Sequence, residues 1–169
     1  MKFYTDGSRI GLHTGNPIIG WGAVCQYGVL CTGSQFGGSN INAEIFAIRD
    51  LLLYLYRYVN NNRIKNSKNN MFKNLDIIDI ETDSLTSIQI INGYMRDSSA
   101  YDLEKSVNYV AADTISKTII KLEENNNIIV KFTHVKGHEK NIGNNFADYV
   151  ATTESMNLLL KSNIKEKYE

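Results

Sequence analysis

Residues 75–84 have the sequence Leu-Asp-Ile-Ile-Asp-Ile-Glu-Thr-Asp-Ser, and this stretch decides the fold class. Its first seven residues, Leu75 to Glu81, are mostly β-branched or apolar, which predicts a buried strand. Thr82-Asp83-Ser84 ends the strand, and either of its last two residues can cap a helix over Leu85 to Tyr94. A strand followed directly by a helix is a unit of α/β domains.

The chain before this stretch predicts a hairpin and one long helix. Residues 1–6 form a short strand that ends at Asp6-Gly7-Ser8. Two apolar runs, Ile18 to Tyr27 and Val29 to Phe36, are separated by Gly28 and predict a β-hairpin. Apolar residues at helical spacing then predict a helix from about Asn42 to Val59.

The chain after the stretch predicts two more helices and a strand. A helical pattern runs from Asp102 to about Glu124, and Ile128 to Thr133 is an apolar strand. A last helix covers about Gly143 to Leu160, followed by the charged tail 161–169. The order β-β-β-α-β-α-α-β-α predicts one α/β domain over residues 1–169, with a mixed sheet made of a hairpin portion and a parallel portion.

Residues 60–74 interrupt this order with a stretch rich in Asn and Lys. The stretch has no apolar period, which predicts a solvated loop insertion at the surface. A second interpretation is a basic arm that contacts a nucleic-acid backbone. Its cations would be Arg63, Lys65, Lys68 and Lys73.

Length and composition indicate an ordinary globular protein of 169 residues, 43% hydrophobic and 21% charged. Met1 to Asp6 turns polar too soon for a secretory signal, and no stretch is long and apolar enough for a membrane-spanning helix. Cys25 and Cys31 lack metal-ligand spacing, which favours buried free thiols in a reducing compartment. We therefore expect a cytoplasmic or other intracellular monomer. The abundance of Asn, Ile and Lys suggests a virus or a low-GC organism as the source.

The balance of charge gives a mild argument against nucleic-acid binding. The chain has 18 basic and 18 acidic residues, whereas nucleic-acid binders usually carry excess positive charge. The argument weakens if several carboxylates bind metal ions, because those charges are then neutralised locally.

Four carboxylates fall where an α/β sheet gathers its chemistry. Asp6 and Asp83 each end a strand, so they would emerge at the same sheet edge if the two strands are parallel neighbours. Glu44 lies in the first turn of the long helix and Asp148 in the first half of the last. Four converging carboxylates repel one another unless cations compensate, and all-oxygen ligands suit Mg²⁺ or Mn²⁺.

Three of the four carboxylates also have an ordinary structural interpretation. Asp83 can be an N-cap, Glu44 can complement a helix dipole, and Asp6 before Gly7 is a common turn pair. Only their joint placement favours a metal site. A pair of such ions about 3.5–4 Å apart activates water and stabilises the leaving oxygen in phosphodiester cleavage.

Five local motifs in order resemble type I ribonuclease H over nearly the whole chain. They are Tyr4-Thr5-Asp6-Gly7-Ser8, Asn42-Ala43-Glu44, Glu81-Thr82-Asp83-Ser84, His134-Val135-Lys136-Gly137-His138 and Gly143-Asn144-Asn145-Phe146-Ala147-Asp148. The resemblance implies a five-stranded mixed sheet flanked by helices, the ribonuclease H-like fold. It also implies that two magnesium ions are bound by Asp6, Glu44, Asp83 and Asp148.

The resemblance further implies how the active site works. His138 matches the mobile-loop histidine of the family, which assists product release or proton transfer. The substrate would be an RNA/DNA hybrid, recognised through ribose 2′-hydroxyls. The positions that match this groove are Gly7, Ser8, Ser39, Asn40 and Ser84. For Ser39 and Asn40, helix capping is an equally good interpretation.

Several positions depart from the family pattern. Gly37 stands where the family has the arginine of a phosphate pocket, and Ile41 and Leu85 stand where amides are common. The Trp- and Lys-rich protrusion is missing between Asn92 and Asp113. Tyr94, Tyr101 and Tyr109 could supply stacking surface there, although core packing is the better explanation. We expect weaker hybrid binding with a shallower salt dependence than in basic members of the family.

The expected activity is endonucleolytic hydrolysis of RNA within RNA/DNA hybrids, giving 3′-hydroxyl and 5′-phosphate ends. One alternative is a nuclease that acts on another nucleic acid. Another is a hybrid-binding module with weak or no catalysis, which the presence of all four carboxylates disfavours. Met1 stands directly before the first strand, which favours a freestanding protein over a detached reverse-transcriptase domain.

Overall fold

The sheet and its helices follow the order that the sequence predicts. The computed structural model describes residues 1–11, 16–65, 71–72, 75–137 and 141–168. Its elements in chain order are β1 (Lys2–Ile10), β2 (Ile18–Cys25), β3 (Gly28–Phe36), α1 (Asn40–Lys65), β4 (Ile77–Thr82), α2 (Leu85–Arg96), the 3₁₀ turn η1 (Ser98–Ala100), α3 (Val107–Asn126), β5 (Ile129–His134) and α4 (Ile142–Tyr168).

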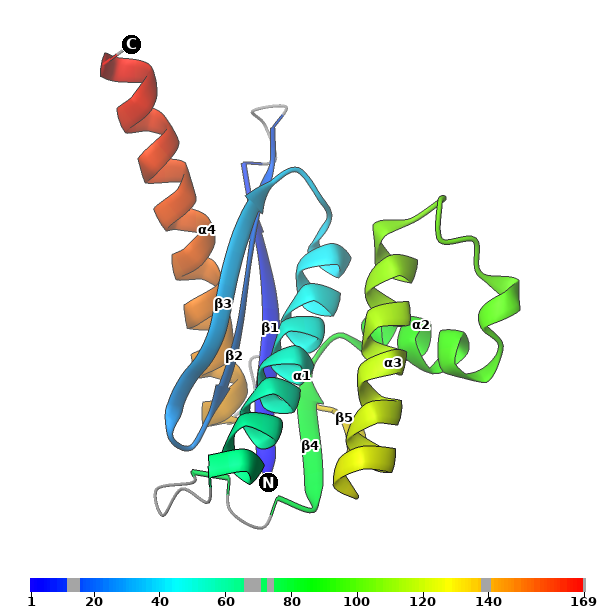
Figure 1. The fold of residues 1–169 in the computed structure, drawn as a ribbon. Coiled ribbons are helices and arrows are strands. Elements are labelled where there is room, and N and C mark those ends of the chain that lie inside the picture. The colour runs from blue at the N-terminus through cyan, green and yellow to red at the C-terminus, as the bar shows by residue number, and fades with distance from the viewer. Residues whose placement is uncertain (12–15, 66–70, 73–74, 138–140, 169) are drawn as a thin grey trace.

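The five strands form one mixed sheet in the order β3-β2-β1-β4-β5. β1, β2 and β3 pair antiparallel as a meander, whereas β1, β4 and β5 are parallel. The helix α1 carries the chain from β3 across the sheet to β4, which lies beside β1. The parallel neighbours β4 and β5 need a crossover connection, which α2 and α3 supply. The predicted α/β fold with hairpin and parallel portions is confirmed (Figure 1).

Helices cover both faces of the antiparallel part of the sheet. Successive side chains of a strand point to opposite faces, and β2 shows this alternation clearly. Trp21 points toward α1, where its Nε1 donates to Asp50 and its ring packs against Phe46. Gly20 and Gly22 face α4, and a Cβ on Gly20 would lie 2.3 Å from the backbone oxygen of Ala151. Because these glycines have no side chain, α4 can approach the sheet closely.

The main core lies between the sheet, α1 and α3. Residues of α1 such as Ile48, Leu51 and Leu55 are fully buried, because this helix packs against both the sheet and α3. Burying side chains of this size stabilises the fold by about 1.5–3 kcal/mol each. α4 lies on the other face of the sheet and contributes a smaller cluster around Ala147 and Val150.

The long helix α1 continues six residues past its predicted end at Val59. The apolar period stops there, but no proline or glycine ends the helix. Asn60 instead donates from Nδ2 to the carbonyl of Tyr56 and accepts from Asn126. The predicted loop over 60–74 is therefore wrong for residues 60–65, which are helical.

The rest of this predicted insertion contains a core anchor. Phe72 is buried and packs edge-to-face against Tyr58 and Phe3. Phe72 and its neighbour Met71 are isolated in a polar stretch and show no apolar period, so the sequence pattern does not predict a buried residue there. The side chains of Arg63, Lys65, Lys68 and Lys73, which define the alternative basic arm, lie outside the described part of the structure.

Other boundaries shift by short distances. β1 extends to Ile10 because it keeps pairing with β2 beyond Asp6. Gly28 opens β3 with a positive φ of 116°, so the hairpin turn is Gln26-Tyr27. α3 begins at Val107 rather than Asp102, because Ser106 caps it by accepting from the backbone N–H of Asn108. α4 reaches Tyr168, so most of the predicted tail is helical.

Candidate active site

Asp6 and Asp83 meet because β1 and β4 are parallel neighbours. Tyr4 pairs with Glu81, and each aspartate follows two residues later in its chain. β1 pairs with β4 only as far as Tyr4, while its pairing with β2 continues to Ile10. The sheet therefore opens beside Asp6, and Asp83 enters that opening directly after β4.

Glu44 is brought to the same place by the close contact of α1 with β1. A Cβ on Gly7 would lie 2.4 Å from the backbone nitrogen of Glu44 and 2.7 Å from the carbonyl carbon of Ala43. Only glycine permits this approach. Glu44 is the fifth residue of α1 and so lies in the second turn, not in the first turn as predicted. The helix-dipole explanation of Glu44 loses support, since that effect is confined to the first turn.

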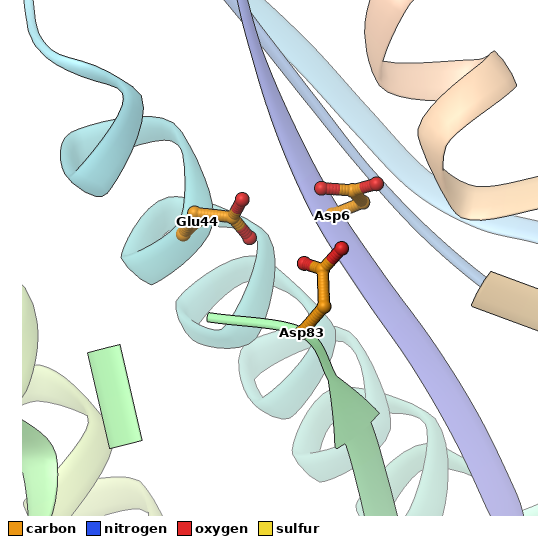
Figure 2. A group of neighbouring side chains, drawn as sticks. All are labelled: Asp6, Glu44 and Asp83. Atoms are coloured by element: carbon orange, nitrogen blue, oxygen red, sulfur yellow. The ribbon is translucent and has the colours of Figure 1, made fainter. Parts of the chain in front are cut away.

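The three side chains point toward one another (Figure 2). Each offers a carboxylate oxygen, and these oxygens all lie within 4.8 Å of one another. Asp6 and Glu44 are buried and Asp83 is half-buried. An oxygen-only cluster of this size is the donor set that Mg²⁺ and Mn²⁺ prefer.

Burial and mutual repulsion raise the pKa values of two of these carboxylates. Burial and the neighbouring Asp83 charge raise the pKa of Asp6 to about 7, although a hydrogen bond from the Gly7 N–H at 2.7 Å opposes this rise. Burial, followed by the charge of Asp6, raises the pKa of Glu44 well above its usual range. Within the described structure, Glu44 Oε2 is buried without a hydrogen-bond partner. A cation would satisfy this atom and relieve the repulsion.

Asp148 lines the same surface hollow, which has a volume of about 650 Å³. The other lining residues are Asp6, Gly7, Ser8, Arg9, Asn40, Ile41, Glu44, Asp83, Ser84, Leu85 and Thr86. The charge of Asp148 also contributes to the raised pKa of Asp6. All four predicted carboxylates therefore border one hollow, with three in direct proximity and Asp148 in its wall.

A hydrogen-bonded bridge fixes the start of α4, which carries Asp148. Asn141 donates from Nδ2 to Glu81 at 2.9 Å and accepts from the backbone N–H of Asn144 at 3.2 Å. Asn144 is buried and donates from Nδ2 to Asp83 at 3.5 Å. It lies one turn before Asp148, so it aligns α4 with the end of β4. Asn144 was not predicted as a site residue, although its i, i+4 spacing from Asp148 places both on the same side of a helix.

The N-caps of α1 and α2 show which of the alternative interpretations hold for the residues beside them. Ser84, not Asp83, caps α2 by accepting from the backbone N–H of Ser87. Asp83 therefore has no capping role that would explain its position. Ser39 caps α1, accepting from the N–H of Asn42, and Ser39 does not line the hollow. Asn40 is exposed and does line it.

The remaining candidate site residues are two histidines and one arginine. His138 lies outside the described residues, so its predicted assisting role has no structural test. His134 ends β5 with its Nε2 3.2 Å from the backbone oxygen of Asp83. Arg9 lines the hollow and is exposed, which makes it a candidate for phosphate contact that the sequence analysis missed.

The departures from the family pattern lie around the hollow or beside it. Ile41 and Leu85 line the hollow with apolar side chains, and Leu85 is 48% exposed. Gly37 has a positive φ of 77° and precedes α1. Tyr101 packs against the tilted ring of Tyr94 and edge-to-face against Tyr109, with ring centroids 5.7 and 4.9 Å apart. The packing explanation of these tyrosines is thus supported, since Tyr94 is buried as well.

The sheet order and the acidic hollow define a ribonuclease H-like α/β protein. The sequence model of the RNase H family matches residues 1–156, and the chain belongs to that family. None of the curated protein sequences compared with the chain matches it. The predicted family and fold are confirmed.

Solved structures share the fold at low sequence identity. LC11-RNase H1, isolated from compost by a metagenomic approach, is 20% identical with a TM-score of 0.55, covering 94% of this chain and 96% of its own. LC9-RNase H1 is 14% identical with a TM-score of 0.59, covering 92% and 72%. The foamy viral protease-reverse transcriptase, solved in complex with an RNA/DNA hybrid, is 20% identical with a TM-score of 0.52, covering 91% and 20%. This chain thus corresponds to about one fifth of the viral protein.

Proposed function

We propose that this protein hydrolyses the RNA strand of RNA/DNA hybrids endonucleolytically, using divalent cations and leaving 3′-hydroxyl and 5′-phosphate ends. The observation that carries the proposal is the convergence of Asp6, Glu44 and Asp83 in a surface hollow of an RNase H family chain. Asp148 in the wall of that hollow supplies the fourth carboxylate.

The residues of the hollow fit magnesium ions. Every candidate ligand is a carboxylate, the pKa values of Asp6 and Glu44 are raised, and Glu44 Oε2 has no partner in the described structure. We propose that Asp6, Glu44, Asp83 and Asp148 hold two Mg²⁺ ions, for which Mn²⁺ can substitute. Such ions lower the pKa of a bound water and stabilise the charge that develops on the leaving oxygen of a phosphodiester.

The protein's own contribution is to hold these groups in place before substrate arrives. The Gly7 N–H fixes one oxygen of Asp6, so the carboxylate cannot turn away from Glu44 and Asp83. Asn144 orients Asp83 and ties the start of α4 to β4. Pre-organised ligands of this kind avoid reorganisation during the reaction. His138 would assist product release or proton transfer.

Recognition of the hybrid is proposed at the same hollow. Gly7, Ser8, Asn40 and Ser84 border it beside the carboxylates, where they can contact ribose 2′-hydroxyls. Ser39 would contribute from the cap of α1, outside this lining. Arg9 adds a cation for a phosphate. The shared fold of the foamy viral protein that was solved with an RNA/DNA hybrid supports this choice of substrate.

The broader setting follows from the same residues. We propose that residues 1–169 act as one ribonuclease H domain in an intracellular, reducing compartment. Cys25 and Cys31 are free, and burial raises the pKa of Cys31 to about 12, so this thiol stays protonated. Among the described residues, no helix is long and apolar enough to cross a membrane.

The decisive assay compares three labelled duplexes: RNA/DNA hybrid, double-stranded RNA and double-stranded DNA. We expect cleavage only in the RNA strand of the hybrid, with Mg²⁺ or Mn²⁺ and not with chelator. Equal cutting of double-stranded DNA would show a nuclease for another polymer. Hybrid binding without any cutting, in either metal, would show a binding module instead.

A substitution at Leu85 tests where the hybrid lies. Leu85 is exposed in the hollow, so Leu85→Gln adds an amide that can donate to the hybrid without removing a buried contact. One added hydrogen bond contributes about 0.5–1.5 kcal/mol, so we expect hybrid Kd to fall roughly 2- to 10-fold. Fluorescence anisotropy with chelator present measures this.

Ile120→Gln is the matched control, because Ile120 is a similarly exposed apolar residue on α3 that does not line the hollow. It should leave Kd unchanged. If both variants bind alike, the hybrid does not contact Leu85.

A further inference from the structure

The side of α4 that faces away from the sheet is apolar. Five of its large hydrophobic residues are 40–84% exposed: Ile142, Phe146, Tyr149, Met156 and Leu160. We call these five residues and Thr153 the α4 stripe. The opposite side of α4 holds Ala147, Ala151 and Ser155, which are fully buried against the sheet. None of the stripe residues belongs to the two buried clusters that form the core.

The spacing of the α4 stripe is that of a helix-pairing seam. Its positions recur at intervals of four, three, four, three and four residues from 142 to 160. The mean interval of 3.6 residues equals one helical turn, so the six positions lie along one side of α4, where a second helix can pack. None of its six residues is charged, so two copies can approach one another without repulsion. The last turns of α4 also extend beyond the sheet, where a second helix has access (Figure 1).

We propose that the α4 stripe pairs with the α4 stripe of a second copy of this chain, in antiparallel orientation about a two-fold axis. Centred on the stripe, this pairing sets Ile142 opposite Leu160 and Phe146 opposite Met156. It sets Tyr149, the largest side chain of the stripe, opposite Thr153, the smallest. An isologous interface requires this kind of self-complementarity.

The exposed area matches what a dimer needs. The stripe exposes on the order of 600 Å² in each copy, so pairing buries about 1,200 Å² in total, the lower limit of stable interfaces. An apolar hollow of about 550 Å³, lined by Met1, Tyr4, Val24 and Phe146 among others, adjoins the Ile142 end. Antiparallel pairing brings Leu160 of the second copy to that end.

The proposed dimer differs from the monomer expected from the sequence. In sequence alone, both sides of this helix carry apolar residues, so the exposed side cannot be told from the buried one. Only the packing of α4 against β2 shows which side is left uncovered.

Light scattering after size exclusion tests the pairing. We expect a particle of twice the 19.1 kDa chain mass for the parent. Tyr149→Glu and Met156→Glu each place a charge in the seam, and each should give a particle of single mass with unchanged circular dichroism. Ile120→Glu, an exposed apolar-to-charged change on α3, should remain a dimer.

Two results would overturn the proposal. The first is a parent of single mass at concentrations up to about 100 µM, above the micromolar Kd expected for an interface of this size. The second is a dimer that both stripe variants leave intact. Co-sedimentation of a single-mass parent with anionic vesicles would assign the stripe to a lipid surface instead. None of these outcomes depends on hybrid cleavage.

Cysteine cross-linking tests the orientation. Chains with Ile142→Cys and chains with Leu160→Cys, mixed and oxidised, should form a disulfide between unlike chains. Each variant alone should form none through the stripe, because antiparallel pairing separates equal positions at the two ends. Cross-linking of Ile142→Cys chains with one another would contradict the antiparallel arrangement.

Discussion

Asp83→Asn is expected to reduce hybrid cleavage on the order of 10³-fold or more while leaving the fold intact. Metal-bound carboxylates contribute several kcal/mol to phosphodiester cleavage, and each 1.36 kcal/mol corresponds to a factor of ten in rate. Asp83 is half-buried at the end of β4, and Ser84 rather than Asp83 caps α2. Removing its charge therefore affects the acidic cluster and not the start of the helix.

The matched control is Asp79→Asn. Asp79 lies in the same strand, is half-buried, and accepts a hydrogen bond from Thr133. It does not line the hollow, so the same chemical change there should leave the cleavage rate within a few-fold of the parent. Single-turnover cleavage with saturating enzyme measures the chemical step in both variants. An Asp83→Asn enzyme that cleaves at the parent's rate would show that the cluster does not bind the catalytic metal.

The positions of Asp6 and Asp83 could be predicted from the sequence because they depend only on the topology of the sheet. Asp6 and Asp83 each lie two residues beyond the last pair of the two parallel neighbouring strands, so both emerge at the edge where this pairing ends. Strand pairing confirms that β1 and β4 are such neighbours. The apolar runs and the helical spacing likewise predicted every helix and strand of the main order.

Features of the site that depend on close contacts could not be predicted from the sequence. The place of Glu44 in the second turn of α1 depends on how nearly that helix approaches Gly7. The link from Asn144 to Asp83 joins residues 61 positions apart and leaves no periodic signal. The end of α1 was missed because hydrogen bonds of Asn60, rather than apolar contacts, accompany its last turns.

Asp6→Asn is expected to stabilise the metal-free protein at pH 8 by about 2–4 kcal/mol, and by little near pH 4. Burial and the charge of Asp83 raise the folded-state pKa of Asp6 from 3.8 to about 7. Between these two values the folded protein keeps a proton that the unfolded chain has released. Its stability therefore falls as pH rises from about 4 to 7, and each unit of the difference corresponds to 1.36 kcal/mol.

An asparagine at this position removes that penalty and can keep its oxygen as acceptor for the Gly7 N–H. Removing the Asp6 charge also lowers the pKa of Glu44 toward its usual range, which adds to the gain at pH 8. Urea unfolding with chelator at pH 4.5, 6 and 8 measures the difference, and Asp79→Asn again serves as the control. A gap between variant and parent that does not grow with pH would contradict the buried-carboxylate account.

Excess Mg²⁺ should make the parent more stable than the Asp6→Asn variant. Ligands that bind only the folded state stabilise it by RT ln(1 + [L]/Kd), so Mg²⁺ at about 1,000 times its Kd adds about 4.1 kcal/mol to the parent, which exceeds the 2–4 kcal/mol advantage of the variant. The Asp6→Asn variant lacks the central carboxylate of the cluster and should gain far less. Parent and variant thus exchange rank between chelator and excess Mg²⁺ at pH 8. This exchange links the folding energetics of the acidic hollow to cation binding without any measurement of cleavage.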